Sequence, residues 1–158
     1  MKLIVAALLA LTTITAAAGP VKAEGDMECL AKNIYFEARN QSLTGKIAVS
    51  HVVLNRVFDD RFPNNICDVI YQARLRNGFP IRHQCQFSWY CDGLSDVPKD
   101  RVSWEIALNV ARDAMLLWEN AFDITSGATH YHTTQVNPSW NRDMEMLVRI
   151  DDHLFWKN

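Results

Sequence analysis

Glu37 is the residue with the clearest potential for chemistry. It lies three residues after Ile34 and seven after Leu30, so on a helix it falls at the edge of the apolar face. A carboxyl group held against apolar neighbours stays protonated to higher pH, because burial disfavours its charged form. Cleavage of a glycosidic bond requires such an acid. The alternative is a structural glutamate paired with Arg39 or Arg56, which is the commoner use of such a residue.

A second group of candidates could line a groove for a sugar chain. Sugar-binding grooves combine hydrogen-bonding groups with flat apolar faces, and four consecutive residues offer both: Gln86, Phe87, Ser88 and Trp89. The alternative for Phe87 and Trp89 is a place in the core, since aromatic side chains dominate cores. Tyr131 is a further candidate for the groove, and Trp140 is left open between the two roles.

The histidines raise the question of a metal site. His130 and His132 would share one face of a strand, and a third ligand could come from His51, His83 or His153. No carboxylate or cysteine stands at a recognisable ligand spacing from them. We therefore expect no metal and no other cofactor.

The four cysteines are Cys29, Cys67, Cys85 and Cys91. An even number in an exported chain favours disulfides. Three pairings are possible, of which we favour Cys85–Cys91, because it closes a short loop, and by elimination Cys29–Cys67. The alternative for Cys29 is a thiolate nucleophile with a histidine base, against which the three other cysteines argue.

Helices are expected to position most of these groups. Apolar residues that recur at three- and four-residue steps predict four of them, at residues 27–39, 44–57, 66–73 and 101–121. Thr44 can cap the second helix. This helix is expected to be largely buried, because its apolar side chains cover much of its circumference.

The rest of the chain predicts loops and a few strands. Residues 74–100, rich in Gly, Pro, Asp and Cys, predict a long loop with an extended piece at residues 84–90. Two strands are expected, at residues 129–133 and 147–150, joined through residues 137–140. The predicted fold class is α+β, mainly helical, with a small antiparallel sheet beside an extended cleft.

Residues 1–23 have the pattern of a secretory signal. Lys2 is followed by an apolar run to Ala18, and Ala23 ends a triplet with small residues where signal peptidase requires them. We expect cleavage after Ala23, export, contact with a membrane only through this segment, and one domain at residues 24–158.

The chain has a net charge of −2 and no basic tract, so we expect no nucleic-acid partner. We also expect a monomer.

A series of sequence blocks runs through the chain after the signal. The first is residues 34–39 (IYFEAR), continued by residues 45–57 (GKIAVSHVVLNRV). Further blocks follow in order at residues 62–63, 67–70, 85–88, 91–93, 127–132, 136–140 and 150–155. Together the blocks resemble the cell-wall hydrolase family that includes the spore-cortex-lytic enzymes.

This resemblance implies a fold like that of goose-type lysozymes and lytic transglycosylases, with Glu37 as the catalytic acid. The family's acid is the first glutamate of a Glu-Ala-Arg-Gly-Glu motif. The chain keeps Glu37 but has Asn40 for the glycine and Gln41 for the second glutamate, and a glutamine cannot transfer a proton in the required way. Asp151 also stands where the family usually has a glycine. A residue with a side chain there either strains the turn or indicates a turn of another type.

The resemblance further implies peptidoglycan as the substrate. Glu37 would protonate the oxygen between N-acetylmuramic acid and N-acetylglucosamine, and then act as a base. If it activates the C6 hydroxyl of the same sugar, the product has a 1,6-anhydro end, as in a lytic transglycosylase; if it activates water, the product has a reducing end. Two other hypotheses stay open: a wall amidase or endopeptidase that uses zinc or Cys29, and a non-catalytic wall-binding module.

Overall fold

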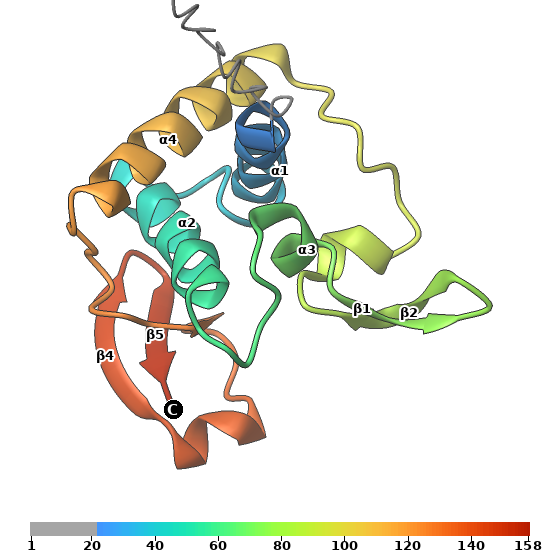
Figure 1. The fold of residues 1–158 in the computed structure, drawn as a ribbon. Coiled ribbons are helices and arrows are strands. Elements are labelled where there is room, and N and C mark those ends of the chain that lie inside the picture. The colour runs from blue at the N-terminus through green and yellow to red at the C-terminus, as the bar shows by residue number, and fades with distance from the viewer. Residues whose placement is uncertain (1–21) are drawn as a thin grey trace, which may run out of the picture.

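A computed structural model describes residues 22–158. Helices form the larger part of the molecule, and small antiparallel sheets lie beside them (Figure 1). The expectation of a mainly helical α+β fold is confirmed. Residues 1–21 of the expected signal lie outside the described residues, so cleavage after Ala23 stays a prediction. No helix within the described range is long and apolar enough to cross a membrane.

The helical part contains four α-helices: α1 (Lys22–Glu37), α2 (Leu43–Val57), α3 (Ile66–Ile70) and α4 (Arg101–Glu119). Helix α2 is central, since α1, α3, α4 and two strands all contact it. Its Val49, Val52 and Val53 are fully buried. The cap of α2 differs from the prediction. Ser42, not Thr44, is the N-cap, because its Oγ accepts the backbone N–H of Gly45 at 3.1 Å.

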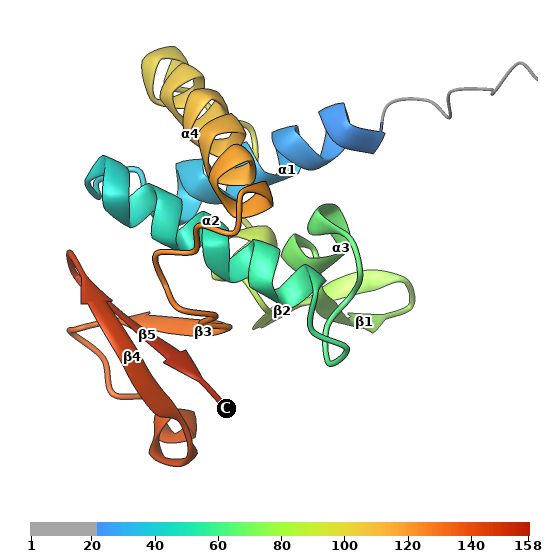
Figure 2. The same cartoon turned by 60° about the vertical axis from the view of Figure 1, so that its left-hand side comes forward.

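A three-stranded antiparallel sheet packs against α2 (Figure 2). Its strands are β3 (His130–Thr133), β4 (Glu145–Ile150) and β5 (His153–Lys157), in the order β3-β5-β4. The prediction of two strands was therefore incomplete. Strand β5 lies between the other two, and its fully buried Phe155 packs against Ala48 and Val52 of α2.

A second, two-stranded sheet occupies the first part of the long loop that the sequence predicted at residues 74–100, and residues 92–100 form no helix or strand. Strands β1 (Ala73–Arg76) and β2 (Phe79–Cys85) form an antiparallel hairpin that projects from the helices (Figures 1 and 2). The expected extended piece at residues 84–90 was wrong. Strand β2 ends at Cys85, and Ser88–Cys91 forms a 3₁₀-helix, η1. A second 3₁₀-helix, η2, spans Ser139–Asp143.

Two disulfides tie these elements together. Cys29 is bonded to Cys67, which joins α1 to α3, and Cys85 is bonded to Cys91, which joins the end of β2 to η1. This is the pairing that the sequence favoured. No cysteine in the described part of the chain is free, so Cys29 does not carry a thiol.

Candidate active site

Glu37 is the last residue of α1, and the sheet supplies its closest described partner. Tyr131 of β3 donates a hydrogen bond from its hydroxyl to Glu37 Oε2 at 3.1 Å. The ring of Tyr131 is fixed in turn by Phe155 and His153 of β5, at 5.8 and 5.2 Å between centroids. The carboxyl group therefore has a defined position where the helices meet the sheet.

The surroundings of Glu37 favour its protonated form. Burial raises the pKa of Glu37, and the hydrogen bond from Tyr131 and the positive charge of Arg56 oppose this rise without cancelling it. The carboxyl-terminal end of a helix carries partial negative charge, which also disfavours a carboxylate there. Burial raises the pKa of Tyr131 well above its usual range, so its hydroxyl stays a donor.

Arg56 places a buried positive charge near this carboxyl group. It lies in the last turn of α2 with 4% of its surface exposed, and its Nε donates to the backbone oxygen of Thr129 at 2.7 Å. Its guanidinium also lies over the rings of Phe62 and Phe87, at 5.0 and 5.5 Å. Burial lowers the pKa of Arg56 to about 10, although the charges of Tyr131 and Glu37 raise it. Arg56 thus stays charged at neutral pH.

The alternative role for Glu37 was to brace an arginine. Among the described residues, Glu37 forms no ion pair with Arg39 or Arg56. Arg39 instead donates to the hydroxyl of Tyr35 at 3.2 Å, with its guanidinium 5.0 Å from the centre of that ring. The geometry therefore favours an acid over a brace.

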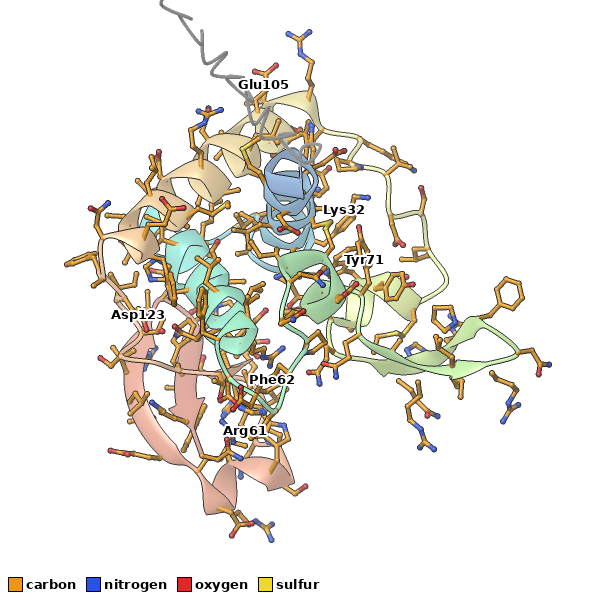
Figure 3. The ribbon with its side chains drawn as sticks, viewed as in Figure 1. Lys32, Arg61, Phe62, Tyr71, Glu105 and Asp123 are labelled. Atoms are coloured by element: carbon orange, nitrogen blue, oxygen red, sulfur yellow. A yellow bond between two sulfur atoms is a disulfide. The ribbon has the colours of Figure 1, made fainter. Side chains whose placement is uncertain are left out.

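A hydrogen-bond network around Asp123 positions the start of β3. Asp123 lies in the connection between α4 and β3 (Figure 3). Its carboxylate accepts from Asn55 Nδ2 at 2.9 Å and from the backbone N–H groups of Thr125 and Gly127 at 2.8 and 2.6 Å. Burial by itself would raise the pKa of Asp123, yet the hydrogen bonds from His51, Thr125 and Asn55 hold it well below its usual range. This network fixes the loop that leads to Tyr131.

The predicted groove residues separate into two pairs. Phe87 and Trp89 are only 3% and 5% exposed and belong to the core, as the alternative for them stated. Trp89 stacks on Phe36 at 4.9 Å and donates from Nε1 to Asn33 Oδ1 at 3.0 Å. Gln86 and Ser88 are exposed. The two aromatics therefore belong to the core, next to Phe36 and Arg56, and the polar pair faces solvent.

The histidines pack with aromatic side chains. His130 and His132 both lie next to Trp140 of η2, and His132 also stacks on Trp156 of β5 at 5.6 Å. Burial lowers the pKa of His130 to about 4, helped by the charge of Arg56. Within residues 22–158, no group of three or more His, Cys, Asp or Glu side chains could hold a metal ion. The geometry of the histidines is that of an aromatic cluster.

Comparison with known proteins places this chain in a family. The profile of a family described as Cell Wall Hydrolase matches residues 40–156, which is most of the chain. The chain belongs to the cell wall hydrolase family. The match begins three residues after Glu37, so the role of Glu37 depends on the geometry and on the motif around it.

Relatives within the family include spore cortex-lytic enzymes. The chain is 29% identical to the spore cortex-lytic enzyme of Halalkalibacterium halodurans over 133 residues, which are 84% of this chain and 34% of that protein. It is 27% identical to the enzyme of Bacillus cereus over 135 residues, which are 85% of this chain and 45% of that protein. The chain therefore spans less than half the length of these relatives.

Solved structures of the family share the fold. The catalytic domain of a germination-specific lytic transglycosylase, SleB, from Bacillus anthracis superposes with a TM-score of 0.66 and 25% identity, over 88% of this chain and 99% of that one. The catalytic domain of the Bacillus cereus SleB protein superposes with a TM-score of 0.62 and 24% identity, over 88% of this chain and 94% of that one.

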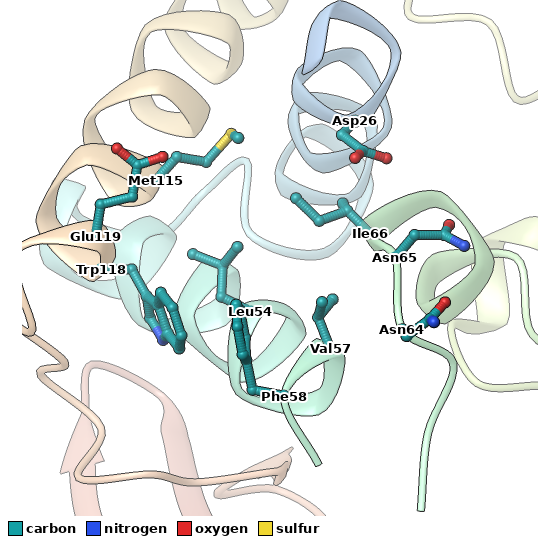
Figure 4. Close-up of a pocket in the computed structure, with 10 residues that line it drawn as sticks. All are labelled: Asp26, Leu54, Val57, Phe58, Asn64, Asn65, Ile66, Met115, Trp118 and Glu119. Carbon is teal, nitrogen blue, oxygen red and sulfur yellow. The ribbon is translucent and has the colours of Figure 1, made fainter. Parts of the chain in front are cut away.

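A pocket of about 300 Å³, which Glu37 does not line, is shown in Figure 4. Apolar side chains of α2, α3 and α4 line it, among them Leu54, Phe58, Ile66, Met115 and Trp118. Its carboxylates, Asp26 and Glu119, lie at the beginning of α1 and the end of α4, whereas Glu37 ends α1 and is not among its lining residues. We do not assign the chemistry of the family to this pocket.

From the sequence, Arg56 was named only as a possible partner of a structural Glu37, and Asp123 was not singled out. The signal for Arg56 was a charged residue in the last turn of a helix whose apolar side chains cover much of its circumference. Such a helix is buried on most sides. Asp123 gave no comparable signal. Its partners are backbone N–H groups of the loop that follows it and the side chain of Asn55, which is distant in sequence. Sequence patterns do not show these contacts.

Proposed function

We propose that this protein cleaves the glycan strands of peptidoglycan as a lytic transglycosylase, with Glu37 as the catalytic acid and base. The observation that carries the proposal is the position of Glu37. It is a partly buried carboxyl group with a raised pKa, held by Tyr131 in a fold shared with lytic transglycosylases of the family. Gln86, Ser88 and Tyr131 are proposed to contact the strand, and Phe87 and Trp89 to support them from the core.

The proposed reaction needs one carboxyl group. Glu37 gives its proton to the oxygen between N-acetylmuramic acid and N-acetylglucosamine, and the bond from C1 to that oxygen breaks. The C6 hydroxyl of the same muramic acid then bonds to C1 and returns its proton to Glu37, which leaves a 1,6-anhydro end. The groups that shift the pKa of Glu37 are Tyr131 and Arg56, and neither is a carboxylate. The proposal therefore uses Glu37 alone and not a scheme with two carboxylates.

The location of the protein forms part of the proposal. Two disulfides are typical of an oxidising compartment outside the cytoplasm. We assign residues 1–23 to a secretory signal and residues 24–158 to one catalytic domain, which acts as a monomer in the periplasm or outside the cell. Its partner is the glycan strand, with no nucleic acid and no membrane contact beyond the signal.

The test is mass spectrometry of purified peptidoglycan after digestion by the wild type and by Glu37→Gln. We expect fragments with 1,6-anhydro ends from the wild type, and a loss of about two to four orders of magnitude in rate for Glu37→Gln. Glu28→Gln is the matched control, since Glu28 is exposed on the same helix. Gln41→Glu, which restores the second glutamate of the motif, should stay within about tenfold of the wild type.

Each other outcome contradicts a part of the proposal. Reducing ends in place of anhydro ends would mean that water, and not the C6 hydroxyl, attacks. Released peptides would indicate an amidase or endopeptidase, and an unchanged polymer would indicate a binding module. A Glu37→Gln variant that unfolds at the same temperature as the wild type and keeps its activity would remove Glu37 from the mechanism.

A further inference from the structure

The hairpin β1–β2 has an irregular base. At its tip, Asn77 and Gly78 both have positive φ, 53° and 82°, as a tight turn between antiparallel strands requires. Leu75 pairs with Pro80 beside this turn, whereas Ala73, two residues earlier, pairs with Cys85. Strand β2 therefore has more residues than β1 between these two pairs and must bulge outward, and bulges of this kind are common next to functional sites.

An open hollow of about 300 Å³ lies at this base. Residues on either side of the bulge line it: Gln72, Ala73, Arg74, Gln84, Cys85 and Gln86. The backbone N–H of Gln86 donates to the backbone oxygen of Gln72 at 2.9 Å, and the disulfide to Cys91 holds Cys85. The hollow thus has a fixed floor, with three primary amides and one guanidinium around it.

The stretch of chain that forms the hollow carries positive charge. Residues 69–91 contain no aspartate and no glutamate, although the whole chain has a net charge of −2. Arg82 is engaged, because its Nε donates to the backbone oxygen of Asp92 at 3.0 Å. Arg74 is exposed and forms no ion pair within the described residues. A carboxylate that entered the hollow would meet a free guanidinium, which binds carboxylates with two parallel hydrogen bonds.

The hollow is connected to the surroundings of Glu37 through the core. Gln86 is followed by Phe87, whose ring lies 5.5 Å from the Arg56 guanidinium, and Arg56 shifts the pKa of Glu37. Trp89, two residues after Phe87, stacks on Phe36, the residue before Glu37. A polymer that binds at Glu37 and extends past these residues toward Gln86 would bring its substituents to the hollow.

We propose that the hollow binds the peptide stem that a muramic acid of the bound strand carries. The inference rests on the proposed function for the polymer, but the site has its own chemistry. A peptide stem offers amide groups, which the glutamine side chains can both donate to and accept from, and carboxylates, which Arg74 can bind. Gln72 Oε1 is shielded from solvent and has no hydrogen-bond donor among the described residues. If the Gln72 side chain rotates toward the hollow, an amide N–H of the stem can donate a hydrogen bond to Oε1.

The test uses the free tripeptide L-alanyl-γ-D-glutamyl-diaminopimelate as the probe, with the whole exported chain. Its addition should shift the NMR signals of the Gln72, Gln84 and Gln86 side-chain amides. Arg74→Gln should weaken binding about three- to tenfold, as for a charge-assisted hydrogen bond at an exposed site. Arg76→Gln is the matched control, since Arg76 is exposed on the same strand but does not line the hollow, and it should weaken binding less than about twofold.

Cleavage provides a second, independent readout. On stem-bearing glycan strands, Arg74→Gln should raise KM by the factor found for the tripeptide and leave kcat unchanged. On strands whose stems an amidase has removed, it should match the wild type. Unmoved glutamine signals, or equal weakening by both arginine variants, would overturn the stem site. Tripeptide binding at the hollow by a wild type that cleaves no glycan would uphold the site and refute the proposed function.

Discussion

Tyr131→Phe tests how the sheet controls the acid. The substitution removes one hydroxyl, whose hydrogen bond to Glu37 Oε2 is 3.1 Å long, and keeps the ring that packs between Phe155 and His153. This hydrogen bond lowers the pKa of Glu37 by stabilising the carboxylate. Its loss should therefore leave Glu37 protonated to higher pH.

The magnitude follows from the environment of the pair. A hydrogen bond to a charged group contributes about 1.5–3 kcal/mol, and the partial exposure of Glu37 favours the lower end of this range. About 1.4 kcal/mol corresponds to a tenfold change in an ionisation equilibrium. The pH at which kcat/KM has fallen to half on the alkaline side should thus move upward by about one pH unit. The loss of the contact that orients Glu37 should also lower kcat at the optimum by up to about tenfold.

The assay is kcat/KM on soluble glycan strands between pH 4 and pH 9 (about the range in which Asp, Glu and His titrate). Tyr35→Phe is the control, because the Tyr35 hydroxyl accepts the backbone N–H groups of Lys99 and Asp100 and does not bind Glu37. It should lower stability and leave the pH profile in place. An alkaline limb that stays fixed in Tyr131→Phe, or moves to lower pH, would refute the assignment of Glu37 as the acid that Tyr131 tunes.

Three further substitutions test the scaffold of the site. Arg56→Met removes the donor to the Thr129 carbonyl and a charge that lowers the pKa of Glu37. Urea unfolding should show that the free energy of unfolding falls by about 1–3 kcal/mol. The alkaline limb of the kcat/KM profile should again move to higher pH. Asp123→Asn puts an amide among N–H donors and should destabilise the fold by about 3 kcal/mol at neutral pH. The lowered pKa of Asp123 means that its contribution is present above its unfolded-state pKa and is lost on acidification, so the two proteins should converge in stability at low pH. Replacing both Cys29 and Cys67 by alanine should lower the free energy of unfolding by about 4 kcal/mol, and replacing Cys85 and Cys91 by about 2 kcal/mol. The difference arises because the closed loops span 38 and 6 residues. Equal losses in urea unfolding would contradict the loop-entropy argument.

The helices and the position of Glu37 were predictable because their signal is local. A period of three to four residues marks a buried helix face, and Glu37 follows directly from its distance to Ile34 and Leu30. The same pattern does not define helix ends well. Helix α1 begins at Lys22 rather than Met27, and α3 ends at Ile70.

The sheets were harder to predict because their partners are distant in sequence. The pair Asn77-Gly78 is a strong signal for a hairpin turn. The residues beside it are exposed on both faces, as Leu75 and Phe79 show, and so lack the alternation that marks a half-buried strand. Burial of Trp89 likewise depends on α1, which supplies Phe36 and Asn33 as its neighbours.

Asp151 makes two distant positions of the chain interdependent. It turns the chain between β4 and β5 with a φ of 50°, and its Oδ2 accepts the backbone N–H and the hydroxyl of Ser42 at 2.9 and 2.6 Å. The same oxygen occupies the space that a Cβ on Gly45 would need. A side chain at residue 45 would therefore displace the Asp151 carboxylate from Ser42, so substitutions at the two positions should not be additive. In sequences of this family, an aspartate in this turn should accompany glycine at the first turn of α2, whereas a glycine in the turn releases that constraint. The identity of one residue thus decides which changes the other can accept during evolution.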